Sequence, residues 1–425
     1  QRWVRYARHL LDPEQPIWWL PCNCWRSEWV FTRTREIMKT YSPVPETDGA
    51  VRITATRDVM RLLMRPGPEA CVPETATRPL LIFITYTGIG DLLMALPLFG
   101  ALRSEFQTLP IIPSSYADLA KLLHHDRLLD GYLLVDKGLV FPRQPLRHLL
   151  MCRALSNLQA DVVAIYGKPV IAYGARLGLL RAGRVLFCHP RGMGPRSTST
   201  FENLPTTGNQ MRDYLQFATR LGLSGDGARA TLTEELNAEL AQEAHSLIPW
   251  PLYVTVAPWT SDPRKDAPLR FFRDCIDIIV HEGGLPVVIT GVAGHGNMTE
   301  DLLRGLPNTQ AISLVGSTTL RQMQGILAGT RFLLTNDGGS LHMARLVGTP
   351  AIAAFGPTAP EQLLHTFTGG YMAIRQELPC SPCAHTPLRY KCPGPYLHCL
   401  RSLEAASARQ ALLLACRAVT EHALL

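Results

Sequence analysis

Two short glycine-containing segments carry side chains suited to acid–base chemistry and to phosphate binding. The first, Gly88-Ile-Gly90-Asp91, places a carboxylate at the start of an expected helix, where it can accept a proton. The second runs from Asn336 through Asp337, Gly338, Gly339, Ser340 and Leu341 to His342. Small residues at a helix start expose backbone amides, which bind phosphate oxygens. The two segments therefore predict a base and a diphosphate-binding turn.

Each segment also has an ordinary structural explanation. An aspartate at a helix start, such as Asp91, is often only a helix cap. Taken alone, His342 is more often a packed or surface histidine than a ligand-binding one. Leucine stands at position 93, where a dinucleotide fingerprint has its third glycine, so a dinucleotide oxidoreductase is disfavoured.

A third candidate segment, residues 257–265, lies between an expected strand and the next helix. Lys265 at that edge can neutralise negative charge as a phosphate leaving group departs, and Thr260 adds a hydroxyl contact. Arg264 is the second choice for the basic role. The alternative is a loop lysine exposed to solvent.

Four cysteines lie within twenty residues near the end of the chain, with the spacing C-x2-C-x8-C-x6-C: Cys380, Cys383, Cys392 and Cys399. Thiolates grouped this closely in a reducing compartment favour a tetrahedral zinc or iron site with a structural role. His385 and His398 are substitute ligands. Four unligated thiols, or two disulfides in an oxidising compartment, are the alternatives.

The elements that must position these residues alternate between strands and helices. Pro79–Thr85 is a continuous apolar run, typical of a buried parallel strand, and a helix is expected over Leu92–Phe106. A second alternating set begins at Tyr253. Two such sets predict two parallel sheets whose carboxyl ends face each other. The other expected strands are Gly131–Val135, Asp161–Ile165, Gly183–Phe187, Tyr253–Ala257, Pro286–Thr290, Gln310–Leu314, Phe332–Thr335 and Ala351–Phe355.

These patterns divide the chain into five parts. We expect a Trp- and Pro-rich extension over 1–78, a Rossmann-like domain over 79–245, a second Rossmann-like domain over 252–379, a four-cysteine finger over 380–400 and a closing helix over 401–425. The Pro-containing stretch at 248–251 is the expected linker.

Composition narrows the class of protein. With 46% hydrophobic and 18% charged residues, the 425-residue chain is expected to be globular. A net charge of +7 suits an anionic donor, acceptor or membrane surface, and the absence of a nucleic-acid-binding motif disfavours nucleic acid. The sequence contains no run of about 18 uncharged apolar residues, as a spanning helix requires. Eleven cysteines favour a reducing compartment and therefore the cytoplasm.

Longer stretches resemble a known family. Gly88–Pro97 resembles the opening segment of glycosyltransferase family 9, to which the ADP-heptose:lipopolysaccharide heptosyltransferases belong, and 336–358 resembles its donor segment. The resemblance spans roughly residues 80 to 400. It implies the two-domain GT-B fold, in which an acceptor domain (79–245) and a nucleotide-sugar donor domain (252–379) face each other across a cleft. It also implies Asp91 as the catalytic base. Where the family has threonine, this chain has Gly338, and Ser340 can compensate for the lost hydroxyl.

The resemblance also implies a function. We expect an inverting transfer of a heptose or related sugar from an ADP-activated donor to a lipopolysaccharide-core or other glycan acceptor, without a cofactor. A protein hydroxyl as acceptor and a non-catalytic nucleotide-sugar-binding protein are the alternatives. Peripheral association with the inner membrane and assembly into an oligomer stay open.

Overall fold

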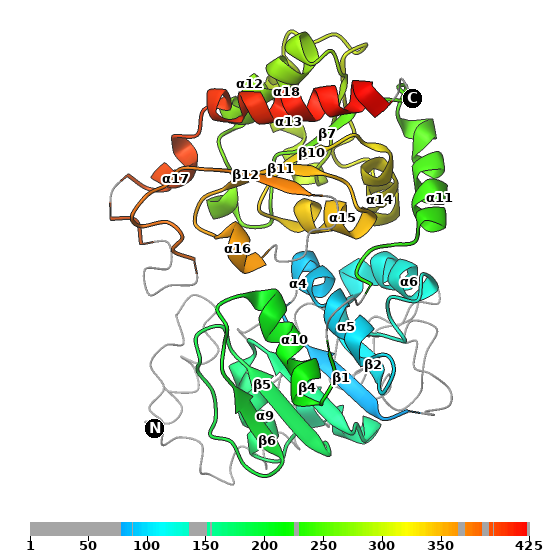
Figure 1. Ribbon diagram of the computed structural model, residues 1–425, viewed down its shortest axis with the longest axis vertical. Helices are drawn as coiled ribbons and strands as arrows, with labels where there is room; N and C mark the ends of the chain where they lie inside the picture. The colour runs from blue at the N-terminus through cyan, green and yellow to red at the C-terminus, as the bar shows by residue number, and fades with distance from the viewer. Residues whose placement is uncertain are drawn as a thin grey trace, which may run out of the picture. The chain divides into compact units, whose positions relative to one another are not determined.

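Two parallel six-stranded sheets form the framework of the protein (Figure 1). The computed structural model describes residues 78–422 apart from 87, 136–150, 154, 225–228, 364–369, 385–390 and 394. The expected extension over 1–78 therefore lies outside the described residues, except for Arg78. Both sheets belong to one compact unit that spans residues 51–425. We call the residues around the first sheet the first lobe and those around the second sheet the second lobe.

The first lobe has the strand order β3-β2-β1-β4-β5-β6, in which all described neighbours pair in parallel. The order reverses between β1 and β4, and this reversal is the switch point where such sheets bind ligands. Its strands are β1 (Leu80–Ile84), β2 (Gln107–Pro113), β3 (Leu133–Val135), β4 (Val162–Tyr166), β5 (Arg184–Cys188) and β6 (Phe201–Leu204). Its helices include α4 (Ile89–Met94), α5 (Leu96–Leu102), α6 (Ala117–His125), α9 (Pro169–Arg176) and α10 (Gln210–Arg220).

The second lobe repeats this topology with the order β12-β11-β10-β7-β8-β9, again parallel. Its switch point lies between β7 and β10. The strands are β7 (Val254–Ala257), β8 (Val287–Ile289), β9 (Ala311–Ser313), β10 (Leu333–Asn336), β11 (Ala351–Phe355) and β12 (Tyr371–Arg375). The helices are α11 (Glu234–Ala244), α12 (Leu269–Asp277), α13 (Gly296–Leu303), α14 (Leu320–Gly329), α15 (Gly339–Val347), α16 (Pro360–Leu363), α17 (His398–Arg401) and α18 (Ala405–His422).

The expected helix over Leu92–Phe106 is wrong in detail. The structure has two shorter helices, α4 and α5, because α4 ends at its C-cap Ala95 and Pro97 lies in the first turn of α5. A proline is tolerated in a first turn but not in a helix interior. After the break, α4 packs mainly against α15, whereas α5 packs against α10.

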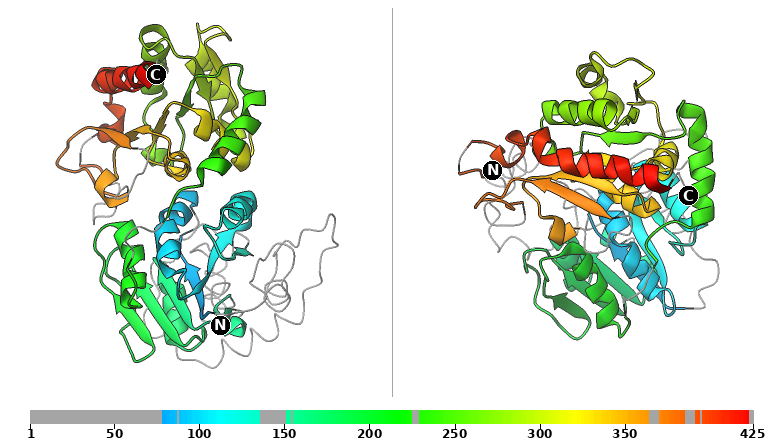
Figure 2. Two further views of the ribbon diagram at one scale, coloured as in Figure 1. Left: turned by 45° about the vertical axis from the view of Figure 1, so that its right-hand side comes forward. Right: turned by 45° about the horizontal axis from the view of Figure 1, so that its top comes forward.

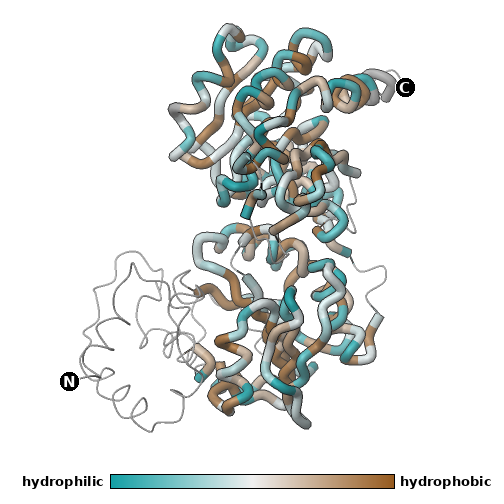
Figure 3. The backbone as a smooth tube through the Cα atoms, turned by 90° about the vertical axis from the view of Figure 1, so that its left-hand side faces the viewer, coloured by the Kyte–Doolittle hydropathy of each residue, from teal (hydrophilic) through white to brown (hydrophobic). Residues whose placement is uncertain are grey.

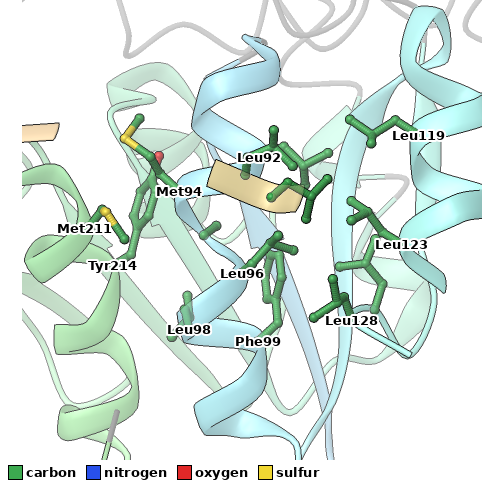
Figure 4. Packing of buried hydrophobic residues seen from close by; sticks show 14 of the residues in the cluster. Leu92, Met94, Leu96, Leu98, Phe99, Leu119, Leu123, Leu128, Met211 and Tyr214 are labelled. Atoms are coloured by element: carbon green, nitrogen blue, oxygen red, sulfur yellow. The ribbon is translucent and has the colours of Figure 1, made fainter. Parts of the chain in front are cut away.

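The core of the first lobe extends into the second lobe as one apolar cluster. In Figure 4, Met94 lies beside Met211 and Tyr214, whereas Phe99 lies near Leu128. The same cluster includes Leu341 of α15 and Phe355 of β11. The backbone tube in Figure 3 carries hydrophobic (brown) segments in both lobes. Shared burial of apolar area therefore links the lobes.

Helix α11 precedes the expected linker but packs on the second lobe. Both views in Figure 2 show it beside α14. The approach is close, because a methyl group on Gly325 of α14 would lie 2.2 Å from the Leu240 carbonyl oxygen of α11. Among the described residues, no helix combines the length and the apolar composition that crossing a bilayer requires.

Candidate functional site

The switch points of both sheets carry the residues that the sequence singled out. Asp91 lies on α4, directly after β1, and the turn from Asp337 to His342 follows β10. Thr260 and Lys265 follow β7, on the other side of the second switch point. These residues are far apart in the sequence, and the matching topologies bring them to the two sheet edges that meet.

Asp91 is held by hydrogen bonds from two elements of the first lobe. Its Oδ2 accepts a hydrogen bond from the Gly88 backbone N–H at 3.1 Å, and its Oδ1 accepts one from the Gln210 side-chain amide at 2.7 Å. Gln210 also donates to the Tyr214 hydroxyl, which lies 2.8 Å from the Thr85 hydroxyl oxygen. This chain of contacts fixes the direction of the carboxylate.

Burial raises the pKa of Asp91 above its ordinary value. The Gln210 amide and the Lys265 and Lys168 ammonium groups offset only part of this increase. A raised pKa suits a group that must both take up and release a proton.

Lys265 pairs with Asp337 at the beginning of the donor turn. Its Nζ lies 2.7 Å from Asp337 Oδ2, and the Thr358 hydroxyl donates to the same oxygen at 2.6 Å. Burial alone would raise the pKa of Asp337, but the Lys265 ammonium and the Thr358 hydroxyl hold it below the ordinary value. Asp337 is thus an ionised anchor that positions a partly exposed ammonium group beside α15.

Gly338 has a local steric reason to be glycine. A methyl group at this position would lie 2.8 Å from Thr260 Cγ2, closer than real contacts of this kind. Thr260 is itself fixed, because its hydroxyl donates to the Asp262 carbonyl at 2.8 Å and its N–H donates to Asp266 Oδ1 at 2.9 Å. The side chain of Thr260 therefore fills the space that a larger residue at 338 needs. Ser340 lies nearby in the first turn of α15 and is half-buried.

The two lobes touch where α4 and α15 begin. A methyl group on Gly90 would lie 2.6 Å from His342 Cδ2, and one on Gly339 would lie 2.4 Å from Ile89 Cγ2. Gly90 and Gly339 thus admit side chains of the opposite lobe. Because Gly90 contacts His342, the next residue, Asp91, also lies near the start of α15.

His342 is buried as a neutral imidazole. Its side chain is almost inaccessible to solvent, and burial, together with the Arg345 guanidinium, lowers its pKa to about 3. Its Nδ1 has no hydrogen-bond partner among the described residues. A buried nitrogen without a partner is unfavourable by about 1–3 kcal/mol, so this nitrogen is a candidate ligand contact.

Arg345 connects the same two helices from within the core. It is 1% exposed, donates to the Leu93 carbonyl of α4 and contacts Met211 Sδ at 3.4 Å. Burial lowers its pKa to about 10. Sequence reasoning missed this residue, since an arginine in the middle of an apolar helix face gives no sign of its partner in the other lobe.

Lys168 is a further site residue that the sequence reasoning missed. It follows β4, at the other side of the first switch point, and its Nζ lies 5.4 Å from the centre of the Tyr86 ring. Burial lowers the pKa of Lys168 to about 8, and the Asp91 carboxylate opposes this change. The available signal was a lysine three residues after the expected strand Asp161–Ile165.

The four cysteines of the expected metal finger gather at one cavity. They line a cavity of about 240 Å³ that also contacts His398, and the Leu397 N–H donates to Cys392 Sγ at 3.4 Å. Burial and the three neighbouring thiols raise the pKa of Cys399 to about 11. The thiols are not joined by disulfide bonds. Within the described residues, however, no three Cys, His, Asp or Glu side chains are arranged to hold a metal ion. The metal site stays a prediction, and His385 lies outside the described residues.

Comparison with known proteins identifies heptosyltransferases among the relatives of this chain. Residues 211–393 match the family described as glycosyltransferase family 9 (heptosyltransferase). The chain is 28% identical over 102 residues to lipooligosaccharide heptosyltransferase 2 of Haemophilus influenzae, covering 23% of this chain and 29% of that protein. It is 25% identical over 160 residues to lipopolysaccharide heptosyltransferase 1 of Pseudomonas aeruginosa, covering 37% and 42%. The matches thus span less than half the length of these relatives.

The fold comparison covers more of the chain. The solved structure of the ADP-heptose lipopolysaccharide heptosyltransferase II of E. coli superposes with a TM-score of 0.58 at 16% identity, over 80% of this chain and 99% of that one. The expected GT-B arrangement of two Rossmann-like lobes is confirmed, as is the resemblance to family 9.

Proposed function

We propose that this chain, whose residues 211–393 belong to glycosyltransferase family 9, transfers a heptose or a related sugar from an ADP-activated donor. The acceptor in this proposal is a hydroxyl group of a lipopolysaccharide core or another glycan. The observation that carries the proposal is the contact of the α4 and α15 helix starts, which brings Asp91 to the turn that ends in His342.

The donor diphosphate lies, in this proposal, at the N-terminus of α15. Backbone amides of Gly338, Gly339 and Ser340 supply donors, and the helix dipole adds positive potential there. Lys265 adds an ammonium group, which is held 2.7 Å from Asp337 and keeps about a quarter of its side chain exposed. The unsatisfied Nδ1 of His342 supports a ligand contact at the same place.

Asp91 acts as the general base. Its carboxylate removes the proton from the acceptor hydroxyl while that oxygen forms a bond to the anomeric carbon. The bond from this carbon to the diphosphate breaks, and ADP departs with the electron pair. Attack opposite to the leaving group inverts the anomeric centre. Lys265 and the α15 amides stabilise the charge that develops on the leaving diphosphate, so we expect transfer to continue in the presence of a metal chelator.

Because α4 and α15 touch, the donor enters when the lobes separate. Reclosure then brings Asp91 against the bound sugar and excludes water, which would otherwise hydrolyse the donor. The continuous apolar cluster and Arg345 favour the closed arrangement. The cytoplasm, where ADP-sugars are used, is the compartment that this proposal implies.

The decisive variant is Asp91→Asn, which keeps the size of the side chain and removes the base. We expect kcat to fall about 10²- to 10⁴-fold, with ADP-heptose binding by calorimetry and the thermal transition preserved. The matched control is Asp301→Asn on α13, an exposed aspartate whose carboxylate pairs with Arg304. Near-normal turnover of the folded Asp91→Asn protein refutes the base. Absence of both ADP-heptose binding and acceptor-dependent ADP release in the unmodified protein refutes the donor.

A further inference from the structure

One stretch of the first lobe is basic without compensating acidic residues. The whole chain has 42 Lys and Arg against 35 Asp and Glu. Residues 162–201 nevertheless contain six basic residues and no acidic one. These residues are Lys168, Arg176, Arg181, Arg184, Arg191 and Arg196. Such a local excess produces a positive surface potential and favours an anionic partner.

Two of the six basic residues already interact with carboxylates of the first lobe. Lys168 is buried beside Asp91, and Arg184 is paired with Glu202 at 2.5 Å. The other four are exposed, and none of them pairs with a carboxylate within the part of the chain that the structure describes. Their charge is therefore available at the surface.

Exposed apolar side chains lie among these arginines. Tyr173 is 52% exposed, Leu177 is 64% exposed and Met193 is 50% exposed. Tyr173 and Leu177 are four residues apart and so share one side of the helical turn at α9. Large apolar side chains exposed together, rather than singly, indicate an interaction surface.

A hydrogen bond joins helix α9 to the loop that follows β5. Arg176 Nε, at the end of α9, donates to the Arg196 carbonyl oxygen at 3.3 Å. The loop that follows β5 thus lies against the C-terminal end of α9. We call Tyr173, Arg176, Leu177, Arg191, Met193 and Arg196 the α9 surface.

We propose that the α9 surface docks the first lobe onto a bilayer that contains anionic phospholipids. Apolar Tyr, Leu and Met side chains enter the boundary of the acyl chains, while the arginines contact the lipid phosphates. A nucleic acid would use the charge but leave the three apolar side chains without a role, so the bilayer is the favoured partner.

The position of this surface fits the proposed function, on which the docking itself does not depend. Helix α9 begins next to Lys168, which faces Asp91. Eight helical residues span about 12 Å, so the α9 surface borders the proposed acceptor site. A glycan acceptor anchored in lipid would reach Asp91 from the bilayer to which the lobe is bound.

The test measures co-sedimentation of the full chain with vesicles of 30% phosphatidylglycerol in phosphatidylcholine and with pure phosphatidylcholine vesicles. We expect binding to the anionic vesicles only. Each arginine near such a surface contributes about fivefold in affinity, so Arg191→Gln/Arg196→Gln should bind about 30-fold more weakly. Leu177→Gln/Met193→Gln should also lose binding, by about tenfold or more.

Matched controls come from the second lobe. Arg270→Gln/Arg304→Gln removes two exposed arginines, and Met372→Gln/Leu414→Gln removes two exposed apolar side chains. Both should bind anionic vesicles like the unmodified chain, and all variants should keep its thermal transition. Equal weakening by control and test pairs overturns the proposal, as does equal binding to neutral vesicles.

Two further outcomes complete the experiment. Tighter binding to a DNA duplex of equal phosphate concentration than to anionic vesicles would identify a polyanion site and overturn the bilayer proposal. Vesicle binding needs no sugar transfer, so its failure leaves the transferase proposal standing, and the reverse also holds. With a water-soluble acceptor, the α9-surface variants should turn over as fast as the unmodified chain, because none of the replaced residues belongs to the proposed site.

Discussion

The distance between helices α15 and α4 depends on Gly339, and replacing it with alanine tests how far activity depends on that distance. The added methyl group would lie 2.4 Å from Ile89 Cγ2, about 1.0 Å short of the 3.4 Å at which ordinary contact begins. The χ1 angle of isoleucine is stiff, so the side chain cannot turn aside easily. One of the helices must therefore shift by about 1 Å.

Two independent estimates give the size of the effect. Overpacking of this kind is unfavourable by about 1–3 kcal/mol; if that cost falls on the closed arrangement of the lobes, the population of this arrangement decreases by a factor of roughly 5 to 150. A shift of about 1 Å between reacting groups lowers rates by about 100-fold. We therefore expect Gly339→Ala to lower kcat/KM for acceptor-dependent ADP release about 10- to 100-fold.

A double variant separates lobe contact from donor binding. Ile89→Ala removes Cγ2, so Gly339→Ala/Ile89→Ala should recover at least tenfold over Gly339→Ala, a coupling of about 1 kcal/mol or more. The control Gly294→Ala places a methyl group where nothing lies within 4 Å and should keep activity within twofold. If the second substitution restores nothing, the loss arises from the diphosphate turn, and the reasoning about lobe contact is refuted.

Four further predictions concern the same site and the cysteine segment. Gly338→Ala should lower donor affinity about tenfold because of its contact with Thr260 Cγ2, and Thr260→Ser, which removes that methyl group, should restore it in calorimetry. Burial lowers the pKa of His342 to about 3 from an ordinary 6.5, so below pH 6.5 the unfolded state binds a proton that the folded state excludes. The free energy of unfolding, measured by urea titration, should therefore fall as the pH drops below 6.5, by up to about 1.4 kcal/mol per pH unit. His342→Gln should flatten this pH dependence, whereas His281→Gln, at an exposed histidine, should not. Lys168→Met removes a charge that lowers the pKa of Asp91, so the acid limb of the kcat/KM profile should move to higher pH; an unchanged limb contradicts the electrostatic coupling. Elemental analysis should find one zinc or iron per chain, lost in Cys392→Ser, if the cysteine spacing forms a metal site; a metal-free protein would show that the spacing is misleading.

Much of the framework could be predicted from the sequence, because buried parallel strands are continuous apolar runs. Ala351–Phe355 was predicted with the observed bounds, and β1 differs by one residue at each end. Strand β2 was missed, since Pro110 and Pro113 argue against a strand that is paired on both sides. The edge strands β6 and β12 were also missed, because their partly exposed residues break the apolar pattern.

Site residues could be predicted from the sequence only where a single short segment showed a recognisable pattern. Asp91 and the donor turn each follow a strand and open a helix, which marks them in the sequence. Gln210 and Lys168 approach Asp91 from segments 119 and 77 residues away, so only the folded sheet identifies them. The direction of the Asp91 pKa shift follows from burial, which a local pattern does not encode.

Helix α11 determines where the molecule can be divided. A second lobe prepared from residue 246 onward would lack this helix. Water would then replace Leu240 and its neighbours on the surface of α14. Gly325 has no side chain that could cover the surface exposed in this way. The Leu232 N–H, moreover, donates to the Leu346 carbonyl at 2.8 Å. An autonomous nucleotide-sugar half is therefore better sought from a fragment that starts near Arg229, well ahead of the proline-rich connection.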